Sequence, residues 1–281
     1  MRAWQLRRLG VSRRASLEIE DDPPLPPWPS PVAYLRGIVR AALLLIVVAI
    51  ALLDYWLNVR NTQHARRKSQ AEWLHRGCCR VVKLLSIQVE THGPLPREGL
   101  VVSNHLSYSD IILLAATTPL LFVSKAEVAD WPIFGLCAKL GGTVFIDRTR
   151  RSEVAPVADE MREVLQSGVP LVLFPEGTST GGDRVLPFKP ALFAPAVSLN
   201  IPVTPCAIGY ALKEGSVTDE ICYWGDDVFA PHLLNFLGKL GLTARIQFGK
   251  RRAPSTDRKE TARVLHAEVF ELYRLSGLMT G

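Results

Sequence analysis

The sequence predicts an α/β domain in which helices flank a largely parallel or mixed central sheet, preceded by an N-terminal membrane-associated helical segment. Two observations predict this architecture. From Ile87 onward, short β-like apolar runs alternate with longer runs at helical spacing. Ahead of that region, thirteen uninterrupted apolar residues extend from Ala41 to Leu53. With 281 residues, the chain is also long enough to bury a substantial core.

Residues 1–30 are expected to form a disordered or extended tail. Five arginines, an acidic patch from Glu18 to Asp22 and a proline-rich run from Pro23 to Pro29 leave this segment too few apolar side chains to pack a core. No apolar stretch follows the basic residues within these positions, which argues against a signal peptide.

Residues 31–87 are expected to form a membrane-anchoring pair of helices. The thirteen apolar residues reach only about 20 Å as a helix, short of the roughly 30 Å hydrocarbon core. A span would therefore require Arg36 and Arg40 to extend toward the membrane surface, and a helix that lies in the interface is an equal alternative. Thr62–Ile87 then places apolar side chains at helical spacing opposite basic ones, which is typical of an amphipathic surface helix.

The basic residues that flank the apolar run indicate which side of the membrane the protein faces. They occur both before and after the run, which favours both ends on the cytoplasmic side, that of a bacterial inner membrane. The alternative is a buried core helix followed by an ordinary solvated helix.

Residues 88–281 are expected to form one α/β domain without an internal repeat. We predict strands at Ile87–Thr91, Leu100–Ser103, Leu120–Ser124, Thr143–Ile146, Leu171–Phe174, Val203–Ile208, Ile221–Trp224 and Ala244–Phe248. We predict helices at Ser107–Ala116, Asp130–Lys139, Ser152–Gln166, Pro190–Leu199 and Thr256–Leu275.

Charge and cysteine content narrow the possible partners. The formal net charge of +6 and the pI near 9.2 suggest an anionic partner: a nucleic acid, an anionic lipid surface or an acidic carrier protein. The basic residues flank an apolar helix instead of alternating with aromatic residues on a sheet, so we expect no nucleic acid as a partner. The five cysteines show no metal-ligand spacing, and we expect no metal.

A histidine and an aspartate follow the predicted strand Leu100–Ser103. His105 and Asp110 fall at a strand-to-helix corner, on the edge of the sheet where open α/β folds place ligands. The carboxylate can bind one imidazole nitrogen and fix the tautomer, so that the other nitrogen acts as a base toward a hydroxyl. The alternative is a helix-capping aspartate beside a histidine that binds backbone.

Three further strand ends carry unusual residues. Gly141–Arg151 ends in a burst of cationic side chains suited to phosphate groups, or is a solvated charge run. Leu171–Gly182 breaks into a loop whose glycines allow backbone N–H groups to approach a ligand, with Glu176 binding substrate hydroxyls or holding the loop. Ile201–Ile208 carries two prolines and is expected to shape an apolar wall, or simply to pack in the core.

These stretches together resemble the four motif blocks of the glycerolipid acyltransferases typified by 1-acylglycerol-3-phosphate acyltransferase. In order, they are Asn104–Asp110, Gly142–Arg148, Phe174–Thr178 and Ile201–Pro205, and the resemblance covers about Leu100 to Gly209. It implies His105 as general base and Asp110 as its orienting partner. It also implies a set of residues that bind the acceptor, namely Asn104, Arg148, Glu176, Gly177, Thr178 and Ser179.

The resemblance further implies direct transfer of a fatty acyl group from acyl-CoA or acyl carrier protein to a lysolipid hydroxyl, with no cofactor. Ser107 and Ser109 lie nearby, but the sequence has no G-x-S-x-G elbow for a covalent serine mechanism. The basic, membrane-docked N-terminal helices of the family are similar to residues 31–87.

One departure from the family pattern bears on the acceptor. Members that act on lysophosphatidic acid usually have an arginine directly after Glu-Gly-Thr, and this chain has Ser179 there. The pattern looks closer to relatives that acylate lyso-ornithine lipid or another lysolipid. Arg184 or Lys189 could substitute for the arginine, which keeps 1-acylglycerol-3-phosphate acyltransferase activity as an alternative. A non-catalytic membrane lipid-binding protein is the alternative of another class.

Overall fold

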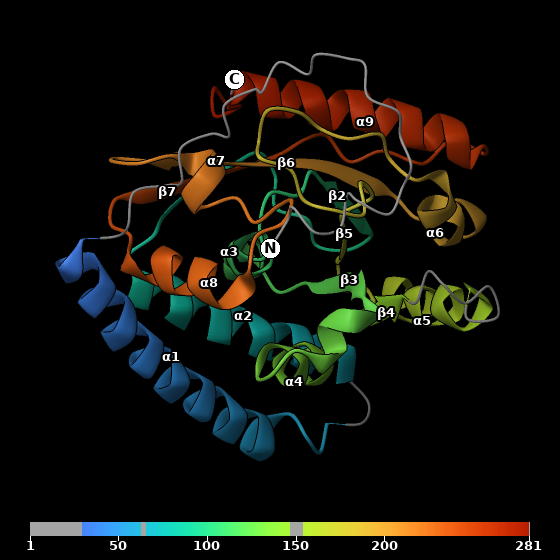
Figure 1. The fold of residues 1–281 in the computed structure, drawn as a ribbon. Coiled ribbons are helices and arrows are strands. Elements are labelled where there is room, and N and C mark those ends of the chain that lie inside the picture. Colours follow the sequence, from blue (N-terminus) through green and yellow to red (C-terminus); the bar gives the residue numbers. More distant parts are fainter. Residues whose placement is uncertain (1–29, 63–65, 147–153, 281) are drawn as a thin grey trace, which may run out of the picture.

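The computed structural model describes residues 30–62, 66–146 and 154–280 (Figure 1). The N-terminal half of the fold contains α1 (Pro31–Asn58), α2 (Arg66–Leu85), β1 (Gln88–His92), β2 (Leu100–Ser103), α3 (Ser109–Thr117), β3 (Leu121–Lys125), the 3-10 helix η3 (Ala126–Asp130), α4 (Phe134–Leu140) and β4 (Val144–Ile146). The remainder contains α5 (Val154–Gln166), β5 (Leu171–Leu173), the 3-10 helix η5 (Pro190–Phe193), α6 (Ala194–Ser198), β6 (Val203–Leu212), α7 (Val217–Glu220), α8 (Phe229–Gly238), β7 (Leu242–Phe248) and α9 (Arg258–Leu275). The expected tail at residues 1–30 lies, apart from Ser30, outside the described residues.

A seven-stranded sheet in the order β1-β7-β6-β2-β5-β3-β4 forms the centre of the fold. Every pairing is parallel except that of β6 with β7, so the expected α/β class with a largely parallel or mixed sheet is confirmed. β2 lies between β5 and β6, and its four residues are buried. Because β2 and β5 run parallel, their carboxyl ends meet at the same edge of the sheet.

Helices cover both faces of the sheet. α9 packs along β6 on one face, and α3 lies on the other with α2 and α1 in successive layers behind it (Figure 1). The core side chains of β2 and β5 are almost entirely removed from solvent, which fixes the position of both strand ends.

One predicted strand is wrong, one helix was not predicted, and one predicted helix is interrupted. Ile221–Trp224 forms no strand, and Ile221 ends α7 in a helical conformation. Ile221 and Cys222 are buried, which explains the strand-like apolar pattern. The apolar residues that follow form α8, a helix that was not predicted from the sequence. The predicted helix at Asp130–Lys139 is divided between η3 and α4, because Ile133 has a φ of 65° between them.

α1 is one continuous helix, longer than the apolar run alone suggested. Ser30 caps its first turn and Pro31 occupies its first position, as helix N-termini favour. Its 28 residues give a length of about 42 Å. Among the described residues it is the one helix long and apolar enough to cross a membrane, with a mean hydropathy of 2.4.

The two arginines of α1 bind protein carbonyls and do not extend toward a membrane surface. Arg36 donates to the carbonyl of Gly238 at 2.8 Å. Arg40 is buried and donates to the carbonyls of Leu237, Lys239 and Leu85 at 3.0, 2.6 and 3.1 Å. These carbonyls belong to the C-terminal ends of α8 and α2, where the helix dipole favours a cation. The extension toward the membrane surface that a span would require of both arginines is therefore not what the structure shows.

α2 is amphipathic as expected, but it is not a surface helix. It lies between α1 and α3, and the buried Trp73 donates from its indole to the carbonyl of Ala51 in α1 at 2.6 Å. Two of its basic residues are paired within the protein: Arg67 with Glu160 and Glu163 of α5, and Arg76 with Asp54 of α1.

Candidate active site

The candidate active site is the corner between β2 and α3. The β2 strand delivers His105 to the carboxyl edge of the sheet, and Asp110 lies in the first turn of α3. The imidazole Nδ1 of His105 is 2.7 Å from Oδ2 of Asp110. The two residues that the sequence singled out are thus brought into direct contact.

The Asp110 carboxylate is fully buried and receives several hydrogen bonds. The backbone N–H groups of Leu106 and Ser107 donate to Oδ2 at 2.7 and 3.0 Å. The hydroxyl of Tyr210, on β6, donates to Oδ1. Burial raises the pKa of Tyr210 well above its usual value, so this hydroxyl remains a donor. A buried carboxylate with this number of donors is held in one orientation.

The Asp110 contact determines the tautomer of His105. Since Nδ1–H donates to the carboxylate, Nε2 carries the lone pair. The ring stacks on Phe174 with the centroids 4.2 Å apart, and the side chain remains 21% exposed. Nε2 is consequently the nitrogen that can accept a proton from a bound substrate.

Glu176 joins the histidine corner to the loop after β5. One carboxylate oxygen accepts from the backbone N–H of His105 at 2.8 Å, and the other accepts from the N–H of Leu186 at 2.6 Å. Burial raises the pKa of Glu176 to about 7, against the lowering effect of these two bonds. These contacts fit the predicted role of Glu176 in holding the loop, and its binding of substrate hydroxyls stays a prediction.

The remaining residues of this loop lie beside His105. The N–H of Thr180 donates to the carbonyl of His105 at 3.0 Å. Gly177 has a φ of 77°, a conformation that favours glycine, and Thr178 is exposed. The hydroxyl of Ser179 donates to the carbonyl of Tyr223.

Two other residues predicted to bind the acceptor, Asn104 and Arg148, lie outside this loop. Asn104 is fully buried, and its side-chain amide exchanges two hydrogen bonds of 2.9 Å with the backbone of Ile208 in β6. These bonds use the amide to hold β6 beside the histidine corner, and the expected contact of Asn104 with the acceptor stays a prediction. Arg148 lies outside the described residues.

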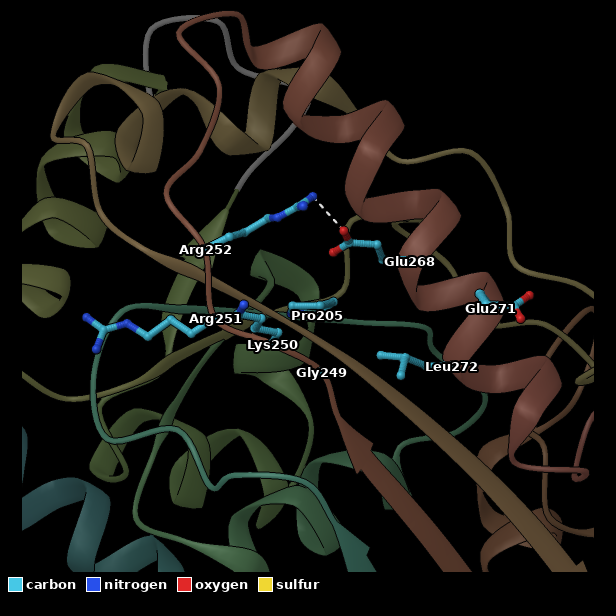
Figure 2. Close-up of a pocket in the computed structure, with 8 residues that line it drawn as sticks. All are labelled: Pro205, Gly249, Lys250, Arg251, Arg252, Glu268, Glu271 and Leu272. Carbon is cyan, nitrogen blue, oxygen red and sulfur yellow. Dashed lines mark ion pairs between the residues drawn. The ribbon is translucent and has the colours of Figure 1, made fainter.

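The expected apolar wall from Ile201–Ile208 is also corrected in part. Pro205 faces α9 and lines a cavity of about 470 Å³ together with charged side chains (Figure 2). Arg252 and Glu268 form an ion pair in this cavity, and Arg251 pairs with Glu98. Pro205 pairs with Val102 of β2, and none of the residues that line the cavity is one of the predicted site residues.

A cluster of aromatic side chains next to His105 was not predicted from the sequence. Tyr108, Tyr223, Phe229 and His232 contact one another, with ring centroids 5.2 to 6.0 Å apart. Burial raises the pKa of Tyr108 and keeps its hydroxyl protonated. The detectable signal was the cluster of aromatic residues from Tyr223 to Phe236, but only the fold brings it to Tyr108.

The site therefore combines an oriented imidazole base with a glycine-containing loop at the carboxyl edge of a parallel sheet. This arrangement is suited to removing a proton from a hydroxyl. Among the described residues, no three metal-ligating side chains lie together.

Comparison with known proteins identifies the class. Residues 86–209 match the family model described as Acyltransferase. Lyso-ornithine lipid O-acyltransferase from Brucella abortus is 33% identical over 245 residues, which cover 81% of this chain and 90% of the relative. The chain belongs to the acyltransferase family and is an enzyme that transfers acyl groups, so the non-catalytic alternative is set aside.

Other relatives refine the position of the chain within the family. Lyso-ornithine lipid O-acyltransferase from Pseudomonas aeruginosa is 36% identical over 217 residues, covering 74% of this chain and 80% of the relative. 1-Acyl-sn-glycerol-3-phosphate acyltransferase from Neisseria meningitidis is 34% identical over 172 residues, covering 60% and 67%. The fold is similar to the crystal structure of the PlsC acyltransferase from Thermotoga maritima, with a TM-score of 0.60, 21% identity and coverage of 86% and 95%.

Proposed function

We propose that this enzyme transfers a fatty acyl group from an acyl thioester to the free hydroxyl of lyso-ornithine lipid or another lysolipid. The observation that carries the proposal is the His105–Asp110 contact, which leaves Nε2 as a base at the edge of the sheet. Relatives named lyso-ornithine lipid O-acyltransferase, matched over most of their length, support the acceptor.

In the proposed mechanism, Nε2 of His105 removes the proton of the acceptor hydroxyl as its oxygen attacks the thioester carbonyl. Asp110 stabilises the imidazolium that forms. Backbone N–H groups of Thr178 and Ser179, in the loop after β5, stabilise the tetrahedral oxyanion. The intermediate collapses with expulsion of the thiolate, which takes the proton from His105. The donor is acyl-CoA or acyl carrier protein, and no cofactor takes part.

The loop chemistry supports an acceptor other than a phosphate monoester. The Ser179 hydroxyl is engaged by the Tyr223 carbonyl and carries no charge. The nearby Arg184 is paired with Asp183 at 2.7 Å. A phosphate gains most from charge-assisted bonds to unpaired cations, which neither side chain offers. The relative from Neisseria meningitidis keeps 1-acylglycerol-3-phosphate acyltransferase activity as the second candidate.

We propose that α1 docks the enzyme on the cytoplasmic face of the inner membrane, with the helix lying along the surface of the bilayer. One side of α1 packs along α8 and α2, and the opposite side exposes large apolar residues, including Leu35, Ile46 and Leu57. A span across the bilayer would carry α2 and its ion pairs into the hydrocarbon. Docking in one leaflet keeps these groups outside it.

A side-by-side acylation assay tests the acceptor and the donor. The full chain, purified in detergent, is given lyso-ornithine lipid, lysophosphatidylethanolamine or lysophosphatidic acid, each with palmitoyl-CoA and with palmitoyl-acyl carrier protein. We expect the highest kcat/KM with lyso-ornithine lipid or lysophosphatidylethanolamine. A preference for lysophosphatidic acid would overturn the acceptor and favour the second candidate. Release from membranes by high salt alone would contradict apolar docking through α1.

A further inference from the structure

The segment Cys222–Val228, between α7 and α8, runs beside the catalytic corner. The N–H of Tyr223 donates to the carbonyl of Leu106 at 2.9 Å, one residue from His105. The carbonyl of Tyr223 accepts from the hydroxyl of Ser179. The backbone of Tyr223 is thus bound to the corner that carries the base and also to the loop after Glu176.

The same segment covers part of that loop. The Trp224 indole lies on Gly181, where an added Cβ would come within 3.0 Å of the ring. Its Nε1 donates to the carbonyl of Thr218 at 3.1 Å, and its backbone N–H donates to Asp227 at 3.2 Å. Trp224 is nevertheless 42% exposed, so it presents an aromatic surface next to the site.

His232 of α8 holds this segment in place. The imidazole is within hydrogen-bond distance of the Tyr108 hydroxyl through Nδ1, at 3.0 Å, and of the Cys222 carbonyl through Nε2, at 2.9 Å. The carbonyl can only accept, so Nε2 carries the proton and Nδ1 accepts from Tyr108. Burial lowers the pKa of His232, which keeps the ring neutral and both bonds formed.

We propose that His232 is a positioning residue for the acceptor. By binding Tyr108 and Cys222 together, it fixes Cys222–Val228 as the wall against which the acceptor headgroup lies when the hydroxyl reaches His105. This inference rests on the proposed acylation of a lysolipid. It assigns to α8 a part in acceptor binding in addition to its packing against α1.

The composition of the wall indicates the headgroup that it favours. The faces of Tyr223 and Trp224 attract cations. Burial is the main cause of the raised pKa values of Tyr108 and Tyr223, and the Asp227 carboxylate adds to it; at His232 the same carboxylate opposes the lowering of the pKa by burial, so its negative charge acts across the segment. An ammonium-bearing headgroup is stabilised in these surroundings, whereas a phosphate monoester is repelled by the carboxylate.

Four variants separate the two bonds of His232. His232→Leu removes both bonds, and Tyr108→Phe removes the hydroxyl while keeping the ring. His232→Asn places an amide near Nδ1 and keeps an acceptor for Tyr108, and His232→Gln places one near Nε2 and keeps a donor for Cys222. The matched control is His75→Leu, because His75 also binds a backbone carbonyl, that of Ala115, but at the far end of α3.

The experiment measures kcat and both KM values with lyso-ornithine lipid and lysophosphatidic acid, together with thermal unfolding, for each full-length variant. We expect His232→Leu to raise the KM for lyso-ornithine lipid roughly tenfold, with kcat within about threefold of wild type and the donor KM unchanged. His232→Gln should raise the KM for lyso-ornithine lipid less than His232→Asn does, because His232→Gln keeps the bond to Cys222 that holds the wall. The preference for lyso-ornithine lipid over lysophosphatidic acid should fall in parallel.

Three results would overturn the inference. They are an unchanged acceptor KM in folded His232→Leu, an equal rise in His75→Leu, or a fall in kcat alone. If His232→Leu does not fold, the order of His232→Gln, His232→Asn and Tyr108→Phe decides, and equal KM values among them count against the inference. Absence of lysolipid acylation by the wild-type enzyme would instead refute the proposed function.

Discussion

The His105–Asp110 corner and the α1–α8 contact both bury an ion and bind it with backbone groups at helix ends. At the corner, the Asp110 carboxylate accepts two backbone N–H groups just before α3. At the other contact, the Arg40 guanidinium donates to three carbonyls at the ends of α8 and α2. Each ion has the sign that the helix dipole favours at that end.

The two regions differ in how far apart their partners lie in the sequence. Apart from the Tyr210 hydroxyl, which comes from 100 residues away, Asp110 binds residues three to five positions away, so a short stretch of chain contains most of the arrangement. Arg40 binds residues 45 to 199 positions away. A local arrangement repeats as a motif that can be read from the sequence. The long-range one has no such pattern, and Arg40 resembles an ordinary residue flanking an apolar run.

The largest effect should come from the local region, through chemistry and not stability. We expect His105→Ala to lower kcat roughly 10²- to 10⁴-fold, because the general base is lost. The side chain is partly exposed and its main bond is to Asp110, so the thermal unfolding temperature should change little. Steady-state kinetics and calorimetry on the same purified protein measure both effects.

His75→Leu is a suitable comparison, because it also removes a bond made by an imidazole Nδ1, outside the corner. It should leave kcat near the wild-type value. Near-normal acyl transfer by His105→Ala would show that the corner is not the catalytic centre, and the contrast between the two regions would then fail.

The long-range region should show the opposite behaviour, with a large effect on stability. Arg40→Leu removes three bonds from a buried guanidinium and leaves the carbonyls without that donor, so we expect a loss of about 2–4 kcal/mol in the free energy of unfolding. Arg36→Leu removes one bond from a half-buried side chain and should cost about 1 kcal/mol. Chemical denaturation of the two variants measures the difference.

The contrast sharpens if Arg40→Leu leaves the acceptor KM intact at a temperature where the protein is folded. Equal losses of unfolding free energy in Arg36→Leu and Arg40→Leu would instead indicate that the three bonds of Arg40 to the ends of α8 and α2 stabilise the protein no more than a single bond does.

The same distinction between local and long-range contacts explains what the sequence could predict. The strands β2 and β5 were found because both are short buried runs that end at glycine, proline or polar residues. The His105–Asp110 contact was found because its parts lie five residues apart. The roles of His105 and Asp110 in catalysis stay a prediction.

What the sequence could not predict depends on contacts between distant segments. Ile221–Trp224 has the apolar pattern of a strand, but its backbone meets Leu106 and Ser179 instead of a neighbouring strand. Tyr210 reaches Asp110 from 100 residues away, and His232 reaches Tyr108 from 124. No property of these residues marks them in the chain, because each is an ordinary member of an apolar element.

Glu176 connects the local and the long-range case, and its predicted effect depends on pH. Its pKa of about 7 in the folded protein lies above the usual value near 4.5, so the folded state favours the protonated form. The stabilisation from this proton is fully present below about pH 4.5 and is lost as the pH rises to 7.

Glu176→Gln removes the titration, so the stability of this variant relative to wild type should rise with pH over this window, by at most about 1.4 kcal/mol per pH unit. The amide also loses one acceptor for the N–H of His105 or Leu186, which adds an offset that does not vary with pH. Urea denaturation of both proteins at several values between pH 4.5 and 8 measures the slope. Parallel stability curves would show that Glu176 is ionised across the whole range and that its two backbone bonds outweigh its burial.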